Sequence, residues 1–301
     1  MRARGPPDER PPATLLRFGV VNLDKPPGPS AHQVAAWIRE MVTDALTALD
    51  GGPGIDDAAH AGTLDPKVTG SLPTMLGDAT RLVERFRTAP KEYVAVLELH
   101  GPAPADLGAT LAAFEGRLYQ KPPRRSAVAR RLRVREVYAL DALKTAERRV
   151  LLRVACESGT YVRKLCHDLG LALGTGAHMG HLRRTGTGPF DDADLVNLHE
   201  FADALAFARE GDVGPLREAV APAERLLDGL PALTIAPAAA REVAEGAPVY
   251  APGVLGVDGD PEQRDQVAVY TPDGAAVCLG TLVGDPGADH GEAVDLDRVL
   301  V

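Results

Sequence analysis

Helical and strand-like patterns alternate over most of the chain, which restricts it to a fold that mixes α-helices with β-strands. Apolar residues recur at helical spacing over residues 30–45, and Ser30 has the capping-box spacing to Gln33 that places the start of this helix. The same kind of pattern predicts further helices over residues 107–114, 161–173 and 198–209.

Stretches rich in β-branched and aromatic residues predict strands over residues 93–99, 128–140 and 148–156. The connection between the last two, residues 141–147, is short and polar. Composition then shifts near residues 228–231, and only short β-rich runs follow, at 267–270 and 276–283, on either side of a Pro-Asp-Gly turn. We therefore expect a domain boundary near Leu230.

The N-terminal segment and the cysteines indicate a cytoplasmic protein. Residues 1–13 are rich in arginine and proline without an apolar run, so we expect no secretory signal and a flexible tail over residues 1–17, with docking on the body as an open alternative. No stretch approaches the roughly 20 consecutive apolar residues of a membrane span. The three cysteines have no paired spacing, which favours reduced thiols over disulfides or a zinc site: Cys156, Cys166 and Cys278.

The charge of the chain gives opposing indications about nucleic acid. Its 42 acidic and 33 basic residues give a formal net charge of −9, whereas a typical RNA-binding domain is basic. Only six of the 33 are lysines, so 27 are arginines. An acidic, lysine-poor composition suits cytoplasms with very concentrated salt, although a GC-rich genome could leave the same composition. Six arginines nevertheless gather in one segment, where they suit phosphates: Arg124, Arg125, Arg130, Arg131, Arg133 and Arg135.

No familiar motif for a nucleotide cofactor, a catalytic metal or a serine nucleophile occurs in the chain. His178 and His181 have a spacing that could reach one metal ion, but no third ligand accompanies them. We therefore expect a reaction that needs no cofactor and no metal.

Asp65 is the main candidate for a catalytic group. It stands in the segment GTLDP, residues 62–66, where the glycine permits an unusual backbone and the proline stiffens the far side. Such a turn can present one carboxylate rigidly into a cleft. On the residues alone, a solvated turn aspartate or a helix N-cap remains an open alternative.

Three further segments place polar side chains beside predicted elements. Tyr93 opens a strand, where an ordinary edge aromatic is the plainer interpretation. Arg163 falls in the first turn of a helix that Thr160 could cap. A cation is unfavourable there, so Arg163 is either a surface charge or a group with a nearby carboxylate partner. Arg183 and Arg184 suit phosphates.

Taken together, these segments resemble the TruB-type pseudouridine synthases, and most closely the archaeal branch whose eukaryotic counterpart is dyskerin. The blocks that carry the likeness occur in the family's order and cover about residues 18–200. They are VNLDKPPGPSAHQV (21–34), GTLDP (62–66), Lys-x-Tyr (91–93), YQKPPRRSAV (119–128), GTYVR (159–163) and Leu-Arg-Arg (182–184). The C-terminal part resembles a PUA domain, a small RNA-binding β-barrel, through residues 252–257 and 266–280.

Two positions depart from the family pattern. Ala31 stands where the family often has a serine, which removes one hydroxyl near a loop. Arg264 and Asp265 stand where a PUA domain usually has Gly-Asp before a valine strand, so the likeness is weaker at that turn.

The resemblance implies an α+β fold, with a mixed, mostly antiparallel central sheet flanked by helices in a catalytic domain of residues 18–228, and a PUA domain over 229–301. It also implies an isomerase that needs no cofactor, because turning uridine into pseudouridine changes neither bond count nor redox state. Asp65 would be the catalytic carboxylate, paired with Arg163, and Tyr93 would stack on the uracil and help to handle its C5 proton. Leu182 would pack under the base, and RNA would be bound by Tyr161, Lys164, Arg124, Arg125, Arg183 and Arg184.

The resemblance leaves the substrate open between two kinds of RNA. The enzyme could act alone on the T-loop uridine of tRNA, or on rRNA with a guide RNA and the other subunits of an H/ACA ribonucleoprotein. The insertion found in bacterial members after the second block is missing, since only residues 101–106 separate strand from helix, and this favours the guide RNA. A non-catalytic RNA-binding scaffold is the alternative from another class. The joint presence of Asp65, Tyr93 and Arg163 argues against a scaffold.

Overall fold

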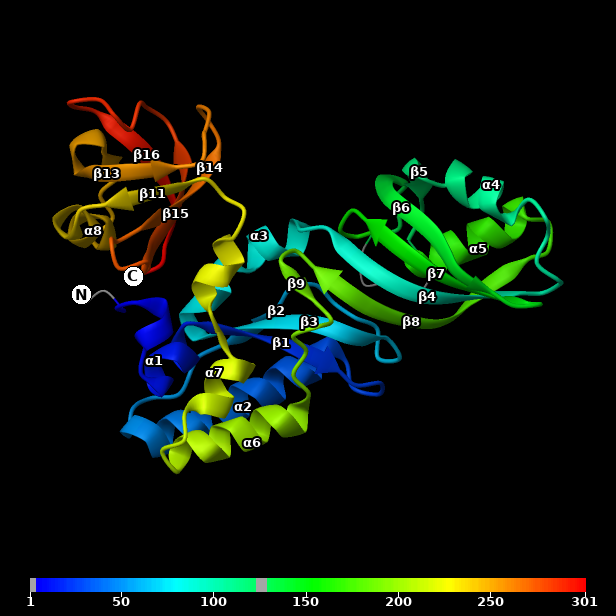
Figure 1. The fold of residues 1–301 in the computed structure, drawn as a ribbon, viewed down its shortest axis with the longest axis horizontal. Coiled ribbons are helices and arrows are strands. Elements are labelled where there is room, and N and C mark those ends of the chain that lie inside the picture. The colour runs from blue at the N-terminus through cyan, green and yellow to red at the C-terminus, as the bar shows by residue number, and fades with distance from the viewer. Residues whose placement is uncertain (1–3, 123–128) are drawn as a thin grey trace.

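The computed structural model describes residues 4–122 and 129–301. The described strands form two sheets, a long one of ten strands and a separate one of six. Figure 1 shows the long sheet running through the body of the molecule, with the small C-terminal sheet at one end beside the N-terminal segment. The predicted α+β class, with a mostly antiparallel central sheet, is confirmed.

The long sheet has the strand order β10-β1-β3-β8-β4-β7-β6-β5, with β2 paired to β3 and β9 paired to β8. Its named strands pair antiparallel except for β3 and β8, which run parallel. The strands are β1 (Gly19–Lys25), β2 (Ala58–His60), β3 (Thr69–Leu76), β4 (Lys91–Leu99), β5 (Gly116–Gln120), β6 (Arg133–Thr145), β7 (Arg149–Cys156), β8 (Ala177–Thr187), β9 (Phe190–Asp191) and β10 (Ala221–Pro222).

The small sheet has the order β12-β16-β15-β14-β11-β13, with β11 and β14 parallel. Its strands are β11 (Ala232–Ile235), β12 (Val249–Tyr250), β13 (Val254–Asp258), β14 (Gln266–Tyr270), β15 (Ala276–Leu282) and β16 (Glu292–Val299).

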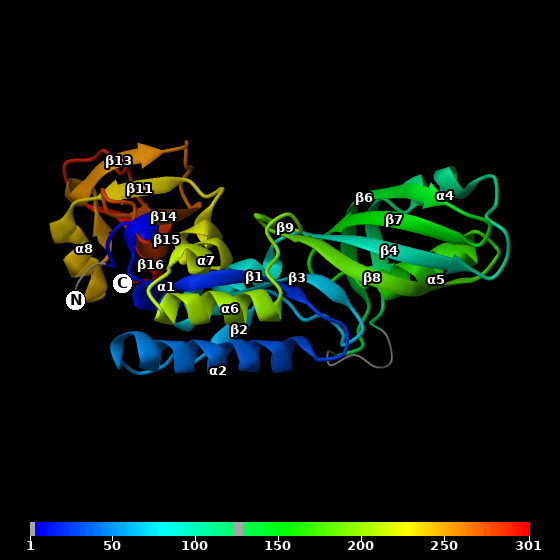
Figure 2. The same ribbon diagram turned by 60° about the horizontal axis from the view of Figure 1, so that its bottom comes forward.

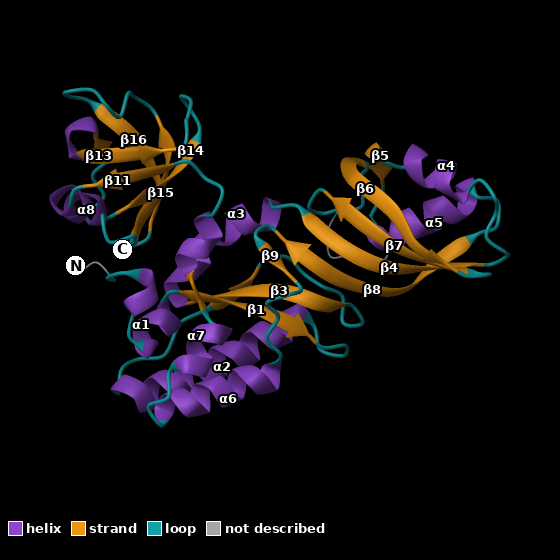
Figure 3. Ribbon diagram, in the orientation of Figure 1, coloured by secondary structure: helices purple, strands orange, loops and turns teal. Residues whose placement is uncertain are grey.

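Helices cover the long sheet at two places. Figures 1 and 2 show α2 and α6 side by side against β1 and β3, and α4 and α5 against the half of the sheet that contains β4 and β6. Figure 3 shows that most helices lie in the body, whereas the C-terminal part consists mainly of strands. The helices are α1 (Pro12–Arg17), α2 (Ala31–Asp50), α3 (Val83–Thr88), α4 (Leu107–Ala113), α5 (Val162–Ala172), α6 (Leu198–Arg209), α7 (Gly214–Ala219) and α8 (Pro237–Ala244), with short 3₁₀ turns η1 (Pro7–Glu9), η2 (Gly77–Leu82), η3 (Ala223–Leu227) and η4 (Ala251–Gly253).

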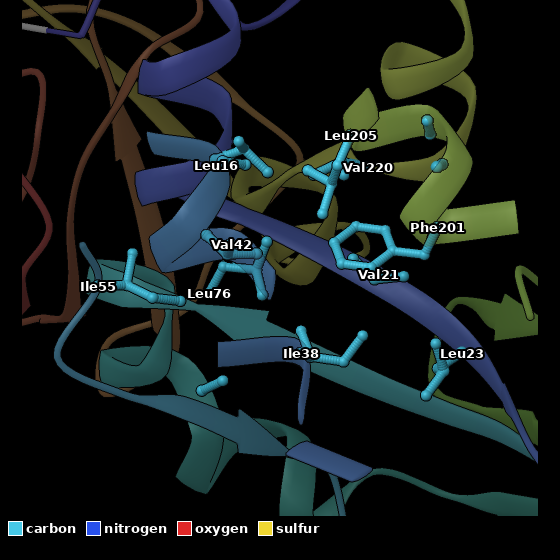
Figure 4. Close-up of a cluster of buried hydrophobic side chains, with 14 of the residues drawn as sticks. Leu16, Val21, Leu23, Ile38, Val42, Ile55, Leu76, Phe201, Leu205 and Val220 are labelled. Carbon is cyan, nitrogen blue, oxygen red and sulfur yellow. The ribbon is translucent and has the colours of Figure 1, made fainter. Parts of the chain in front are cut away.

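The core beneath β1 follows from the apolar faces of α2 and α6. Figure 4 shows Phe201 of α6 pointing toward Val21 of β1, with Ile38 and Val42 of α2 in the same cluster. All four side chains are fully buried. The capping box predicted at Ser30 is present, and it fixes where α2 begins.

The described N-terminal residues, from Arg4 onwards, are packed against the body, which agrees with the docked alternative for this segment. Leu15 and Leu16 of α1 are buried in the core with α2. Arg10 is 1% exposed and forms two hydrogen bonds, at 2.6 and 2.8 Å, with the carboxylate of Glu224. That carboxylate also accepts the backbone N–H of Ala276 at 3.0 Å, so one ion pair joins the N-terminal segment, η3 and the small sheet.

Two local expectations are wrong. Strand β6 continues to Thr145, through most of the predicted connection, because its pairing with β7 extends to Thr145 and Val150. Thr160 does not cap α5: the N-cap is Tyr161, without a side-chain hydrogen bond, and the Thr160 hydroxyl lies beside the Cys156 thiol.

Candidate active site

Asp65 lies in the loop between β2 and β3, and two buried cations hold the backbone of this loop. Gly62 turns the chain out of β2 with a φ of 112°, and its carbonyl accepts hydrogen bonds from the Arg184 guanidinium at 3.3 Å. On the far side of Asp65, the Lys25 ammonium donates to the carbonyl of Pro66 at 3.1 Å. Both cations are buried, so the loop is fixed from beneath on either side of the carboxylate.

Arg163 forms an ion pair with Asp65 across 98 positions of sequence. It is the second residue of α5, which begins just after Tyr161. The side chain of Gln120, itself buried, accepts the N–H of Tyr161 at 2.9 Å and donates to its carbonyl at 3.4 Å. The side chains of Asp65 and Arg163 are 55% and 47% exposed, so a ligand in solvent can reach both.

Tyr93 and Leu182 come from the neighbouring strands β4 and β8. The register places Tyr93 opposite Arg184 and Leu182 opposite Ala95. Both side chains are partly buried, and they pack against the two cores that meet in the middle of the long sheet. Burial raises the pKa of the Tyr93 phenol, whereas the positive charge of Arg184 acts in the opposite direction. The phenol is therefore protonated near neutral pH.

Lys91, at the start of β4, is a third buried cation in this region. Its ammonium donates to the carbonyl oxygens of Phe86 at 3.1 Å and Ala89 at 2.6 Å. Burial, followed by repulsion from Arg184, lowers the pKa of Lys91 to about 7. Its charged and neutral forms are therefore both populated close to neutral pH.

The expected RNA-binding residues have different surroundings. Arg183 makes two hydrogen bonds with Asp24, at 2.9 and 3.1 Å, and is partly exposed, while Lys164 pairs with Asp168 inside α5. Arg184 is 1% exposed and bonded to backbone carbonyls, so it is out of reach of an RNA phosphate, contrary to expectation. Tyr161 is partly buried at the start of α5. Arg124 and Arg125 lie outside the described residues.

A cavity of about 590 Å³ lies elsewhere, between β1, α6 and α7, and contains none of the groups described above. Glu200, Asp203 and Glu218 line it together with the partly exposed Phe207. With Asp194, which pairs with Arg225, four carboxylates line the cavity, and this excess of negative charge would repel a phosphate backbone.

Separate models of protein families match successive parts of the chain. The model of the TruB family pseudouridylate synthase N-terminal domain matches residues 53–106, and that of the tRNA pseudouridylate synthase B C-terminal domain matches 163–228. The PUA domain model matches residues 231–300, and the DKCLD domain model matches residues 4–35.

Relatives cover the whole chain. A probable tRNA pseudouridine synthase B of Haloarcula marismortui is 62% identical over all of this chain and 94% of its own length. A protein of the same name from Halobacterium salinarum is 59% identical, with both chains covered completely. The chain belongs to the TruB family of pseudouridine synthases. The predicted family, with its PUA domain, is confirmed.

Solved structures similar to this chain are titled for a Cbf5 complex and for an H/ACA ribonucleoprotein. A chain in the crystal structure of a Cbf5–Nop10–Gar1 complex has a TM-score of 0.87 and 41% identity, covering 99% of this chain and 90% of that one. A chain in the structure of an H/ACA ribonucleoprotein bound to a substrate RNA containing 2′-deoxyuridine has a TM-score of 0.87 and 39% identity, with the same coverage.

Several residues that shape the site of this TruB-family chain were not singled out by sequence reasoning. Lys25 and Gln120 lie inside the family-like blocks, but nothing in their spacing shows that they bond to backbone groups of the Asp65 loop and of Tyr161. His60 precedes the loop with a buried Nδ1 that has no hydrogen-bond partner among the described residues. Burial, with the nearby charge of Arg184, lowers the pKa of His60, so this ring is neutral at neutral pH.

The described part of the chain has two further negative features. None of its helices is both long enough and apolar enough to span a bilayer. It also contains no group of three or more His, Cys, Asp or Glu side chains arranged to hold a metal ion, and His178 contacts His100 at 3.0 Å instead.

Proposed function

We propose that the chain isomerises uridine to pseudouridine in RNA, with Asp65 as its catalytic carboxylate. The observation that carries the proposal is the ion pair between Asp65 and Arg163, two half-exposed side chains brought together from distant parts of the sequence. Tyr93 and Leu182 on β4 and β8 supply an aromatic and an aliphatic surface for the base. The division into a catalytic domain of residues 18–228 and an RNA-binding domain of 229–301 belongs to the same proposal.

The reaction needs a carboxylate at the sugar, a group that orients it, and a group that handles the C5 proton. The bond between ribose C1′ and uracil N1 breaks, the base turns, C5 bonds to C1′, and C5 then loses its proton while N1 gains one. Asp65 either adds to the sugar as a nucleophile or removes the C2′ proton to give a glycal. Arg163 aims the carboxylate, and Tyr93 stacks on the uracil and takes part in the transfer of the C5 proton.

The uridine must first leave its stack, which costs a few kcal/mol. Contacts with Tyr93 and Leu182 offset part of this cost. Arg183 can exchange Asp24 for a phosphate because it is partly exposed, and Lys164, near the start of α5, is also partly exposed. Arg130 and Arg131 are exposed, so their guanidinium groups can contact phosphates as well.

The similarity to chains in H/ACA complexes supports a ribonucleoprotein role. The matched structures are titled for complexes of Cbf5 with Nop10 and Gar1 and for an H/ACA ribonucleoprotein with substrate RNA. We therefore propose that this chain works in the cytoplasm and modifies both the T-loop uridine of tRNA and rRNA uridines selected by a guide RNA. We also propose that it binds subunits similar to Nop10 and Gar1. Its named relatives are tRNA pseudouridine synthases, which supports the tRNA activity.

The test is to incubate the purified protein with an unmodified tRNA transcript and to map pseudouridine with and without guide RNA, rRNA substrate and the partner subunits. Asp65→Asn keeps the shape of the side chain but removes its charge, so we expect no turnover with nearly unchanged RNA affinity. Isomerisation by the Asn variant at a rate close to that of the unchanged protein would remove Asp65 from the mechanism. An inactive unchanged protein that still binds RNA would favour the scaffold.

A further inference from the structure

Arg184 differs from the other arginines near the site because it is buried without a carboxylate partner among the described residues. Its Nε donates to the carbonyl of Ser71 at 2.6 Å, and both terminal nitrogens donate to the carbonyl of Gly62 at 3.3 Å. Burying a charge that is not paired is expensive, and three carbonyl contacts offset only part of that cost. Stability alone therefore does not account for an arginine at this position.

The backbone around Arg184 is also fixed. β3 passes so close that a Cβ on Gly70 would lie 2.2 Å from the Arg184 carbonyl oxygen. The φ of Gly70 is 96°, a backbone angle that residues with a side chain rarely adopt. The backbone that carries the Arg184 guanidinium is therefore held in place in the middle of the long sheet.

Two proposed catalytic elements meet at this guanidinium. Gly62 opens the segment GTLDP and lies three residues before Asp65, so its carbonyl sets the direction in which the loop leaves β2. Tyr93 lies directly opposite Arg184 on β4, and residues paired in this way on antiparallel strands have side chains on the same face. The charge of Arg184 acts on the Tyr93 hydroxyl.

We propose that Arg184 is a positioning residue for the isomerisation, which holds the Asp65 loop through Gly62 and the Tyr93 hydroxyl through its charge, so that the carboxylate and the phenol keep a fixed separation. The inference rests on the proposed function. It assigns a role to an arginine that does not itself reach the substrate. Lys cannot take over this role, because one ammonium cannot repeat the planar fork that bonds to the carbonyls of Ser71 and Gly62 and to the Tyr93 side chain.

The test compares single-turnover rates and RNA affinities of Arg184→Lys, Tyr93→Phe and the double variant. A displacement of about 1 Å in a reacting group can cost about 100-fold in rate, so we expect a loss of about that size in kcat for Arg184→Lys, with KM and RNA affinity nearly unchanged. We also expect the double variant to lose less than the product of the two single losses, because both act on one unit. Unchanged kcat, equal losses in kcat and RNA affinity, or multiplicative losses would each overturn the proposal.

Arg10→Lys is the matched control, because Arg10 is just as buried but bonds to Glu224, away from the site. It should melt at a lower temperature and keep its kcat. If Arg184→Lys does not fold, Gly62→Ala tests the proposal in its place. A Cβ at this position has room, since its nearest neighbour, Arg184 Nη1, is 3.5 Å away. The φ of 112° is strained for alanine, so the substitution should tilt the Asp65 loop. Unchanged kcat in Gly62→Ala would overturn the proposal. Failure of the proposed function itself is distinct, since the unchanged protein would then make no pseudouridine.

Discussion

The ion pair of Asp65 and Arg163 matters for position more than for stability. Both side chains are about half exposed, and exposed ion pairs contribute roughly 0–1 kcal/mol to folding. The loop and the helix that carry them are held by other contacts, those of Lys25, Arg184 and Gln120. Removing one partner should therefore leave the fold intact and alter only where the other side chain points.

Arg163→Ala is expected to lower kcat by at least about 100-fold while the melting temperature changes by no more than a few degrees. Arg163→Lys should recover only part of the rate, because an ammonium is a point charge on a flexible stem and does not aim the carboxylate as a planar guanidinium does. Pseudouridine formation in single-turnover assays and thermal melts measure the two effects. Rates in the Lys variant equal to those of the unchanged protein across pH would show that the pairing has no catalytic importance.

Lys91 predicts a pH dependence of stability. Its pKa is about 7 in the folded chain, against 10.5 for an ordinary lysine, so between these values the unfolded chain binds more protons. Stability should therefore rise as pH rises from about 7 to 10, by up to about 1.4 kcal/mol for each pH unit from this group. Urea unfolding at several pH values should show a flatter dependence for Lys91→Met. Parallel curves for the two proteins would mean that Lys91 keeps an ordinary pKa.

Sequence motifs could single out Asp65, Tyr93 and Arg163 as candidates, because each belongs to a block of residues with a recognisable order. They could not separate Arg183 from Arg184. The two arginines are adjacent on a strand, so they point to opposite faces, and only the tertiary structure decides which one is buried. The pattern around them has no alternation of polar and apolar residues that would have indicated the buried face.

At the scale of elements, prediction worked where local chemistry fixes a boundary. The helix α6 has the predicted bounds, and its Asn197 and Glu200 form a capping box. Strand β6 runs past the predicted end at residue 140. Its polar residues have a low propensity for strands, but pairing with β7 keeps them extended as far as Thr145. The N-terminal segment has few apolar residues, and its order depends on distant partners that the local sequence does not reveal, chiefly Glu224.

The buried pair of Arg10 and Glu224 gives a prediction about how these elements are joined. Glu224→Gln leaves the Arg10 charge buried without a carboxylate, and breaking a buried pair in this way costs about 3–5 kcal/mol. The free energy of unfolding in urea should fall by that order. Asp194→Asn is the matched control: it breaks the exposed pair with Arg225 and should change stability by less than about 1 kcal/mol. Equal effects of the two substitutions would contradict a joining role for Arg10.

At the scale of the whole molecule, the excess of acidic over basic residues lies at the C-terminal end. Residues 231–301 hold 12 acidic residues against three arginines, whereas residues 1–230 hold 30 of each sign. The net charge of −9 therefore belongs to the part that matches the PUA domain model, and the part that carries Asp65 is neutral overall. Both parts share a core, in which Phe18 and Leu226 pack with Leu279 and Leu300.

This distribution changes how the protein should respond to salt. In dilute buffer, the acidic C-terminal part repels itself, which opposes folding, and it repels the RNA backbone, which opposes RNA binding. At about 1 M salt the Debye length falls to about 3 Å, which removes the repulsion and also most of the attraction from counterion release. RNA binding must then depend on stacking on Tyr93, packing on Leu182 and direct contacts of arginine with phosphate.

We therefore expect folding stability and single-turnover activity to rise together from dilute buffer to molar KCl, where an RNA-binding enzyme with an ordinary basic surface loses activity. Thermal melts and activity assays across a KCl series measure both. A variant that replaces four exposed acids by amides should need less salt to reach full stability, because less repulsion remains: Asp260→Asn, Asp289→Asn, Glu292→Gln and Asp295→Asn. Full stability in dilute buffer, with RNA binding that declines steadily as KCl rises, would show that the acidic end is not an adaptation to salt. The family assignment would stand, because it rests on sequence and fold and not on charge.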